Sequence, residues 1–265
     1  MAVRSLYVEP ERPKAQVDRP ALEFHDVFRI YRSGPVETVA LRGLDLRVER
    51  GQFVAILGPS GSGKSTLLGL AAGLDEPSAG EVRFQGRSLA RMDEDELARL
   101  RASEIALVLQ SENLWPTLSA RENVAVSLRL AGRPDAPRAA LEALAEFGLR
   151  DRAEHHGGAL SGGEQQRVAI AAAAARRAAL VLADEPTGEL DAANELTVLE
   201  ALKRLREDHG STVVAVTHSE QVAAAADRVV QMSDGKVVVP ALGGFDEHHR
   251  EGLGADRRSR ARRLR

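Results

Sequence analysis

The hydrophobic and polar positions along this chain follow two periods, which predict strands and helices in alternation. Between residues 21 and 50, apolar residues recur at about every second position, and this predicts two antiparallel strands joined by a turn at residues 33–35. Further along, short apolar runs alternate with segments of helical spacing, which predicts an α/β fold with a mostly parallel sheet. The expected strands there are residues 53–57, 80–86, 105–109, 179–183, 212–217 and two short ones within 228–239. The expected helices are residues 65–72, 93–101, 168–178, 192–208, 220–226 and a helical stretch within 119–153.

The two ends of the chain lack this alternation. Residues 1–20 are polar, contain three prolines and show no period, so we expect a mobile extension. Residues 240–265 end in a dense run of arginines, which predicts a solvated, disordered tail; the alternative is attraction of this tail to anionic lipid. We therefore expect one folded domain at residues 21–239, with a helical subdomain at about residues 111–165.

Composition narrows the class of protein. The chain of 265 residues is long enough for one large domain or two small ones, and its net charge of −3 gives no general attraction to nucleic acid. It contains no cysteine, which excludes disulfides and cysteine-based zinc sites and suits a reducing compartment. No signal peptide is visible, and the longest apolar run, residues 168–183, is interrupted by two arginines. We expect a soluble, cytoplasmic protein, for which any membrane spans come from another chain.

The stretch from Gly58 to Thr66 carries the clearest chemistry. It fits the spacing G-x-x-x-x-G-K-[ST], between an apolar strand and an apolar helix. Glycines let the backbone approach a ligand closely, and the turn and the helix N-terminus direct N–H groups at a phosphate. Lys64 would reach the β- and γ-phosphates, and Ser65 would offer its hydroxyl to Mg²⁺. The expected nucleotide contacts are Gly58, Pro59, Ser60, Gly61, Ser62, Gly63, Lys64, Ser65 and Thr66.

The alternative reading of this loop is a glycine-rich turn without a ligand. The strand, the loop, the Lys-Ser pair and the helix occur together, and this combination favours binding of a nucleoside triphosphate.

Two adjacent carboxylates end a later apolar strand. Asp184 lies at the carboxyl end of residues 180–183, where an acidic Mg²⁺ ligand belongs in a nucleotide-binding sheet. Glu185 follows it and could polarise an attacking water molecule. A solvated acidic turn is the alternative. The phosphate-binding loop upstream favours the catalytic interpretation.

The segment from Leu160 to Arg167 reads LSGGEQQR. Taken alone, Ser161 and Glu164 have the spacing of a helix capping box, and the two glycines indicate a turn. The octapeptide also resembles the signature motif of ABC ATPases, with Glu164 where glutamine is usual. In that family the Ser161 hydroxyl and the Gly162 and Gly163 amides would grip the γ-phosphate of ATP bound to a second copy. The resemblance thus implies a head-to-tail dimer with two ATP molecules.

Other elements of the ABC ATPase family follow in the expected order. Gln110 matches the Q-loop residue that touches Mg²⁺ and the attacking water, Asp191 matches the D-loop, and His218 matches the switch histidine on the γ-phosphate. Tyr31 matches the aromatic residue that stacks on adenine. Each has a structural alternative: a polar strand end for Gln110, a structural histidine for His218, a strand core residue for Tyr31. The resemblance covers roughly residues 22–239. It implies a P-loop NTPase fold, with a RecA-like core, an antiparallel β subdomain and an α-helical subdomain.

The resemblance implies a division of labour at the site. Tyr31 would bind adenine, and Lys64 would hold the phosphates. Mg²⁺ would be bound by Ser65, Gln110 and Asp184. The catalytic residues would be Glu185, His218, Lys64 and Gln110, which together would hydrolyse ATP.

Two further segments indicate the subfamily. Residues 92–101 and 110–124, together with Asp184-Glu185-Pro186-Thr187-Gly188, resemble the macrolide-exporter and lipoprotein-release class. In that class, ATPase dimers act on the cytoplasmic face of the membrane through separate permease subunits of the FtsX/MacB-like type. The resemblance implies export or mechanotransmission. The alternative within the family is an ATPase that regulates a membrane partner controlling cell-wall hydrolases or resistance sensing, without moving a substrate.

Three positions depart from that class. Glu112 stands where an aromatic residue is usual, Trp115 where leucine is frequent and Glu189 where asparagine is frequent. The first two lie on the expected permease-contact surface, and the third lies near the expected dimer seam. These departures leave the identity of the permease open.

Two rival classes fit less well. Chromosome-maintenance and DNA-repair ATPases have similar heads, but long coiled coils or zinc insertions split them. Here only about a hundred residues separate Lys64 from Ser161, with neither sustained heptads nor cysteine. Translation-associated ABC factors carry two cassettes in one chain, and this chain has one. We therefore expect no nucleic-acid partner.

Overall fold

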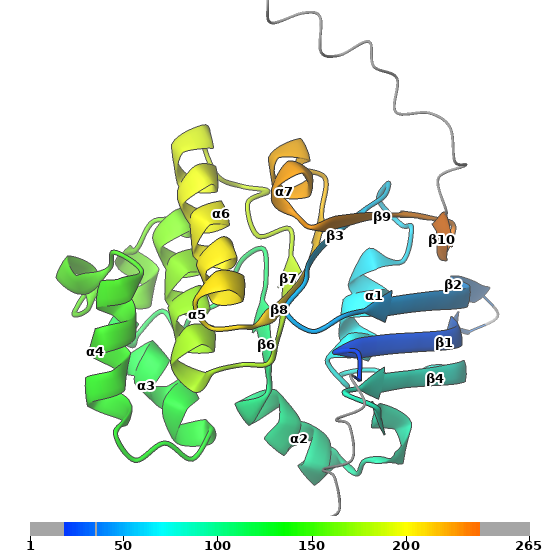
Figure 1. The fold of residues 1–265 in the computed structure, drawn as a ribbon, viewed down its shortest axis with the longest axis horizontal. Helices are drawn as coiled ribbons and strands as arrows, with labels where there is room; N and C mark the ends of the chain where they lie inside the picture. The colour runs from blue at the N-terminus through cyan, green and yellow to red at the C-terminus, as the bar shows by residue number, and fades with distance from the viewer. Residues whose placement is uncertain (1–18, 35, 239–265) are drawn as a thin grey trace, which may run out of the picture.

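The structure, a computed structural model, describes residues 19–34 and 36–238. The expected N-terminal extension (apart from residues 19 and 20) and the arginine-rich tail lie outside the described residues. The described part contains two sheets and a group of helices (Figure 1). It contains no helix that is long and apolar enough to cross a membrane.

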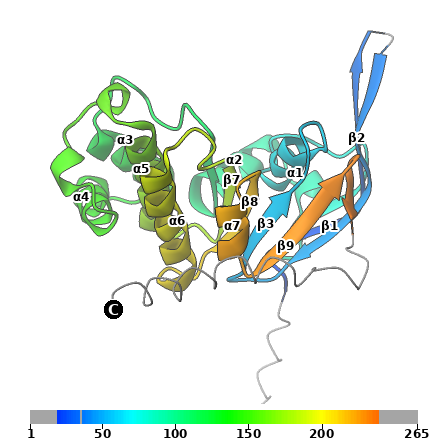
Figure 2. The ribbon, with the colours of Figure 1, turned by 90° about the horizontal axis from the view of Figure 1, so that it is seen from above.

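The first sheet is antiparallel, as the alternating pattern predicted. Its strands are β1 (Leu22–Ser33), β2 (Val36–Val48), β4 (Ala79–Phe84) and β5 (Arg87–Ser88), in the order β2-β1-β4-β5. Along β1, Leu22 and Phe24 are buried and face α1 (Lys64–Ala71) and the second sheet. Figure 2 shows the β1–β2 hairpin extending beyond the rest of the molecule.

The second sheet is parallel except for one edge strand. Its strands are β3 (Phe53–Leu57), β6 (Ile105–Val108), β7 (Leu180–Asp184), β8 (Thr212–Thr217), β9 (Arg228–Ser233) and β10 (Lys236–Val238). They lie in the order β10-β9-β3-β8-β7-β6, with β10 antiparallel to β9. Because β3, β6, β7 and β8 are parallel neighbours, their carboxyl ends meet at one edge of the sheet. The phosphate-binding loop, Gln110, Glu185 and His218 follow these ends.

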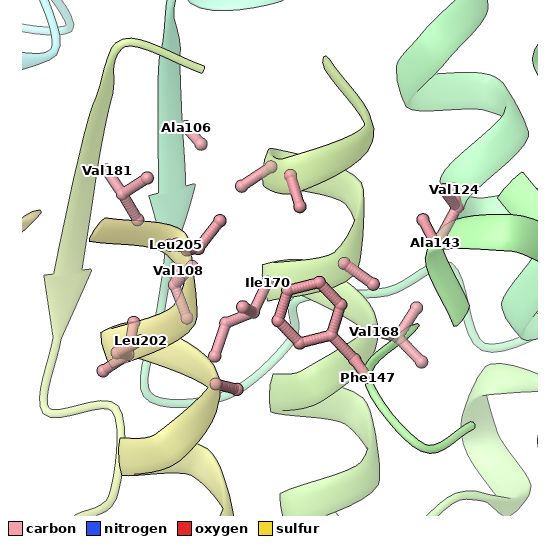
Figure 3. Close-up of a cluster of buried hydrophobic side chains, with 14 of the residues drawn as sticks. Ala106, Val108, Val124, Ala143, Phe147, Val168, Ile170, Val181, Leu202 and Leu205 are labelled. Carbon is pink, nitrogen blue, oxygen red and sulfur yellow. The ribbon is translucent and has the colours of Figure 1, made fainter. Parts of the chain in front are cut away.

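Both faces of the parallel sheet are buried, which explains why its strands read as continuous apolar runs. Successive residues point to opposite faces, so Val181 belongs to one core and Leu182 to the other. Figure 3 shows the first core, where Val108 and Val181 from the sheet meet Ile170 and Leu202 from two helices. The second core fills the space between the two sheets around α1.

The remaining helices lie mostly on one side of the parallel sheet, with α3 and α4 packed on α5 at one end of the molecule (Figures 1 and 2). They are α2 (Glu94–Ser103), α3 (Ala120–Leu130), α4 (Ala136–Glu146), α5 (Gly162–Arg176), α6 (Ala192–Glu207) and α7 (Glu220–Ala225). Three short 3₁₀ segments occur at Leu89–Arg91, Arg150–Arg152 and Gly157–Ala159.

One helix boundary differs from the expectation by more than two residues. The sequence predicted a helix at residues 168–178, but α5 already begins at Gly162. The Ser161 hydroxyl accepts the backbone N–H of Glu164, and the Glu164 carboxylate accepts the N–H of Ser161. This capping box satisfies the free N–H groups of the first turn, so two glycines enter the helix despite their poor propensity.

Candidate functional site

A cavity of about 980 Å³ lies at the carboxyl edge of the parallel sheet, beside the antiparallel sheet. It brings together eleven of the predicted site residues from five separate parts of the chain. These are Tyr31, Ser60, Gly61, Gly63, Lys64, Ser65, Thr66, Gln110, Asp184, Glu185 and His218. This volume is within the range of cavities that enclose a small ligand.

The phosphate-binding loop fits against backbone from both sheets. Gly63 has φ 97° and ψ 7°, a left-handed conformation that favours glycine. A Cβ on Gly63 would lie 2.6 Å from the carbonyl oxygen of Ala40, and one on Gly58 would lie 2.3 Å from that of Met232. A side chain at either position would collide with this backbone, so both positions require glycine. Gly58, Pro59 and Ser62 are the predicted loop residues that are not part of the cavity lining.

The Lys64 ammonium is held across this loop. Its Nζ donates to the carbonyl oxygens of Gly58, at 2.7 Å, and of Pro59, at 3.1 Å, and lies 3.3 Å from Nε2 of His218. The side chain is largely buried, since Lys64 is only 8 % exposed. Its positive charge therefore faces the cavity in a setting with little solvent screening.

Asp184 and Glu185 lie next to each other at the end of β7 in different surroundings. Burial raises the pKa of Asp184, the negative charge of Glu185 raises it further, and contacts with Ser65 and Lys64 act in the opposite direction. The Glu185 carboxylate accepts the backbone N–H of His218 at 3.1 Å, and its other oxygen lies 3.3 Å from Nε2 of His218. Glu185, His218 and Lys64 thus form one continuous polar group.

The residues predicted to hold Mg²⁺ have a suitable donor set. The Ser65 side chain acts to lower the pKa of Asp184, and Ser65, Asp184 and Gln110 all line the same cavity. Hydroxyl, carboxylate and amide oxygens are hard ligands of the kind that Mg²⁺ prefers. The residues present therefore fit this ion.

Gln110 has two contacts that the motifs alone did not reveal. Its side-chain amide donates to the carboxylate of Glu189 at 3.1 Å. Glu189, one of the three residues that depart from the subfamily pattern, therefore lies directly beside a predicted site residue. The backbone carbonyl of Gln110 accepts a hydrogen bond from Nε2 of Gln166 at 2.8 Å. Nε2 of Gln166 also donates to the backbone carbonyl of Leu109 at 2.7 Å. Gln166, which is buried on α5, therefore anchors the Q-loop to the helix that carries the signature motif.

A second residue that sequence analysis missed is Glu195, on α6. Its Oε1 accepts the Ser219 hydroxyl at 2.5 Å and the Thr187 hydroxyl at 3.2 Å. It thereby joins the loop after Glu185 to the loop after His218, and it lines the cavity. An isolated glutamate on a helix face gives no sequence signal for this role.

The signature and D-loop residues lie outside the cavity lining of their own chain. These residues are Ser161, Gly162, Gly163 and Asp191. A Cβ on Gly163 would come within 2.8 Å of Asn194, so the N-terminal ends of α5 and α6 are in close contact. Asp191 caps α6 by accepting the Asn194 N–H at 2.9 Å, and this hydrogen bond lowers the pKa of Asp191.

Glu164 combines its capping role with an ion pair. One oxygen accepts the Ser161 N–H, and the other lies 2.8 Å from Nε of Arg152. Burial acts to raise the pKa of Glu164, but the backbone of Ser161 and the guanidinium of Arg152 outweigh it, so this pKa is lowered. The carboxylate is therefore charged at neutral pH and fixed at the helix N-terminus.

Comparison with known proteins agrees with the resemblance to ABC ATPases that the sequence motifs indicated. The family model described as ABC transporter matches residues 41–188. The chain is 43% identical over 231 residues to the macrolide export ATP-binding/permease protein MacB of Azoarcus sp. (strain BH72), covering 86% of this chain and 35% of that protein. The chain is 46% identical over 221 residues to MacB of Nitrobacter winogradskyi, and this match covers 83% of this chain and 34% of that protein. The chain thus spans about a third of the length of these curated relatives.

Solved structures agree. The dimeric structure of a post-hydrolysis state of the ATP-binding cassette MJ0796, bound to ADP and Pi, matches with a TM-score of 0.77 and 39% identity. The match covers 84% of this chain and all of that chain. The P-loop NTPase fold predicted from the sequence is confirmed. The chain belongs to the ABC transporter family and is an ATP-binding, ATP-hydrolysing cassette of that family.

Proposed function

We propose that this chain is the ATPase subunit of an export or mechanotransmission complex, and that it drives separately encoded permease subunits from the cytoplasmic face of the membrane. The observation that carries this proposal is the single cavity that joins Tyr31, the phosphate-binding loop, Asp184, Glu185 and His218. The names of the MacB relatives, which are macrolide export proteins, support the export class.

In this proposal, different residues of the cavity bind the base, the phosphates and the metal ion. Tyr31 stacks on adenine, while the loop N–H groups and Lys64 hold the phosphates. Ser65, Asp184 and Gln110 hold Mg²⁺, which would neutralise charge on the phosphate oxygens.

The hydrolytic step is proposed for Glu185 and His218. The Glu185 carboxylate orients a water molecule and accepts its proton, and His218 steadies the γ-phosphate. Their contact, at 3.3 Å, keeps both groups at one end of the cavity.

The site is proposed to be completed by a second copy of the chain. Ser161, Gly162 and Gly163 lie at the N-terminus of α5, where N–H groups and the helix dipole attract anions. They do not line their own cavity, so they are free to close on ATP of the partner, with Asp191 at the seam. The dimeric state of MJ0796 supports this arrangement.

A separate groove supports the permease contact. A cavity of about 400 Å³ lies between α2, α3 and α5, and Leu114, Trp115 and Leu130 are among its lining residues. Trp115 is 54 % exposed and Leu130 is 67 % exposed, so two large apolar side chains are open to a partner. We place the permease contact here, next to the Q-loop.

Affinity co-purification from the native host's membranes tests the partner assignment. The Glu185→Gln variant, with ATP present to hold the closed dimer, should recover a four-span permease with a large extracytoplasmic domain. Adding Trp115→Ala should reduce that recovery. The matched control is Leu74→Ala, which removes a similarly exposed apolar side chain outside the groove and should have no effect.

Other results would change the assignment. A many-span permease would place the chain in another transporter class, and recovery of soluble proteins or nucleic acid alone would contradict the transport proposal. Recovery of cell-wall hydrolases with a permease would favour the regulatory alternative.

A further inference from the structure

Behind the ring of Tyr31 lies a cluster of charged groups that the family motifs do not include. The Tyr31 hydroxyl donates to Oδ2 of Asp75 at 2.6 Å. The Arg29 guanidinium contacts both oxygens of the same carboxylate, with Nε at 2.9 Å from Oδ2 and a terminal nitrogen at 2.6 Å from Oδ1. The guanidinium carbon also lies 4.5 Å from the centre of the Tyr31 ring. These three side chains form one closed set of contacts.

This cluster leaves the ring with one usable face. Arg29 covers one face, and the hydroxyl contact with Asp75 fixes the rotation of the ring about its bonds. Tyr31 is nevertheless 40 % exposed and lines the nucleotide cavity, so its other face is open. An aromatic base stacked there would find a ring that is already immobilised, and binding would not have to order it.

The cluster also ties Tyr31 to the phosphate-binding loop. Asp75 lies just beyond the C-terminal end of α1, the helix whose N-terminus carries the loop. Nearby, the Ser78 hydroxyl accepts the backbone N–H of Ile30 at 3.0 Å, and the N–H of Ser78 donates to Phe28 at 2.7 Å. The strand that contains Tyr31 is therefore hydrogen-bonded to the segment that follows α1. These contacts fix the position of the Tyr31 ring relative to the phosphate-binding loop at the other end of α1.

We propose that Arg29 and Asp75 are positioning residues for nucleotide recognition, holding the Tyr31 ring so that its open face receives the base of a nucleoside triphosphate. This rests on the proposed contact between Tyr31 and adenine. The two residues act through Tyr31, since neither of them lines the cavity. Their contribution should therefore appear only for ligands that carry a base.

Calorimetric titration of the full chain with two ligands tests this proposal. ATP carries a base, whereas inorganic tripolyphosphate offers only the phosphates. Arg29→Met and Asp75→Ala should each raise the Kd for ATP about 3- to 10-fold, the size expected for a weakened stacking contact. The Kd for tripolyphosphate should stay at the wild-type value. Tyr31→Phe, which keeps the ring but loses the hydroxyl contact, should have a smaller effect of the same kind.

Arg32→Met is the matched control. Arg32 lies on the same strand and pairs with Glu37 at 2.9 Å, away from the cavity lining, so this variant should bind both ligands as the wild type does.

Three results would overturn the proposal or its basis. Wild-type ATP affinity in the Arg29 and Asp75 variants, together with weak binding by Tyr31→Ala, would refute the positioning role and leave the adenine contact intact. Wild-type ATP affinity in Tyr31→Ala would refute the adenine contact itself. An equal loss for ATP and tripolyphosphate would show that the cluster supports the whole loop, which also contradicts the proposal.

Discussion

Glu185 carries its carboxylate on a backbone conformation that side chains rarely adopt. Its φ is 43°, in the left-handed region, which costs of the order of 1–3 kcal/mol for such a residue. Surrounding contacts hold it there: its N–H donates to Val216 at 2.9 Å, and its carbonyl accepts from Gly188 at 3.0 Å. The turn directs the carboxylate at His218, where the proposed hydrolytic chemistry takes place.

Replacing Glu185 with glutamine should separate binding from hydrolysis. The amide keeps the size of the side chain and can still accept the N–H of His218, but it cannot accept a proton from water. We expect phosphate release to slow about 10²- to 10⁴-fold, the usual contribution of a general base, with ATP affinity close to wild type. Steady-state phosphate release and calorimetric titration would measure the two quantities.

Glu220→Gln is the control for this change, because Glu220 is exposed on the short helix after His218 and lies outside the cavity lining. Wild-type turnover in Glu185→Gln would exclude Glu185 as the base.

Sequence reasoning found site residues wherever type and spacing carry the chemistry. Lys64, Asp184 and His218 each end or follow a strand of the parallel sheet, and the sheet brings such ends together. Sequence reasoning did not identify Gln166 or Glu195, because the roles of these residues depend on tertiary contacts between loops. A buried glutamine or a helix-face glutamate has no local pattern that distinguishes it from a structural residue.

At the scale of single elements, the largest error in the predicted bounds is the start of one helix. The strands at residues 53–57 and 212–217 were located to the residue, because their unbroken apolar runs stop at polar turns. The start of α5 was placed six residues too late, since glycine propensity outweighed the capping signal in that prediction. The spatial order of the strands is set by long-range packing, which no local pattern encodes.

The capping box of α5 gives a prediction for stability and pH. Because the folded pKa of Glu164 is lowered, its charge stabilises the fold above the unfolded pKa, and this stability is lost as the pH falls through the folded pKa. Glu164→Gln keeps the Ser161 contact and loses the charge pair with Arg152. Since Arg152 is half exposed, we expect a loss of at most about 0.5 kcal/mol at pH 7, which disappears once the pH lies below the lowered pKa of Glu164.

Urea unfolding at several pH values would measure this difference, with Arg152→Gln and the double variant completing a mutant cycle. A destabilisation of the Gln variant that persists at low pH would mean that the ion pair is not its cause.

At the scale of the whole molecule, the N-termini of α1 and α5 lie in different places relative to the cavity. The N-terminus of α1 faces the cavity, whereas that of α5 lies outside the cavity lining. In the proposed dimer, one molecule would therefore offer half of each of two sites. A symmetric pair in which every α5 faces the partner's cavity would complete both sites at once.

ATP should therefore cause the Glu185→Gln variant to dimerise. With hydrolysis blocked, each ATP would stay between two copies, and light scattering after size-exclusion chromatography should give twice the monomer mass. The same variant with ADP should stay monomeric, because ADP lacks the γ-phosphate that the signature helix would contact in the proposed dimer. A dimer of equal abundance with ADP, or none with ATP, would contradict the proposed arrangement.

The backbone around Ala40 has a consequence for how the molecule handles its nucleotide. A Cβ on Gly63, in the phosphate-binding loop, or on Gly235, between β9 and β10, would lie about 2.6 Å or 2.5 Å from the same Ala40 carbonyl oxygen. Three segments that are distant in sequence thus come close together at the backbone of Ala40, and the Leu41 side chain also packs against Gly63. Because neither Gly63 nor Gly235 has room for a side chain, we expect the two sheets to keep their relative position when a nucleotide binds. In the proposed dimer, the movement that follows binding would then be the approach of two molecules to each other.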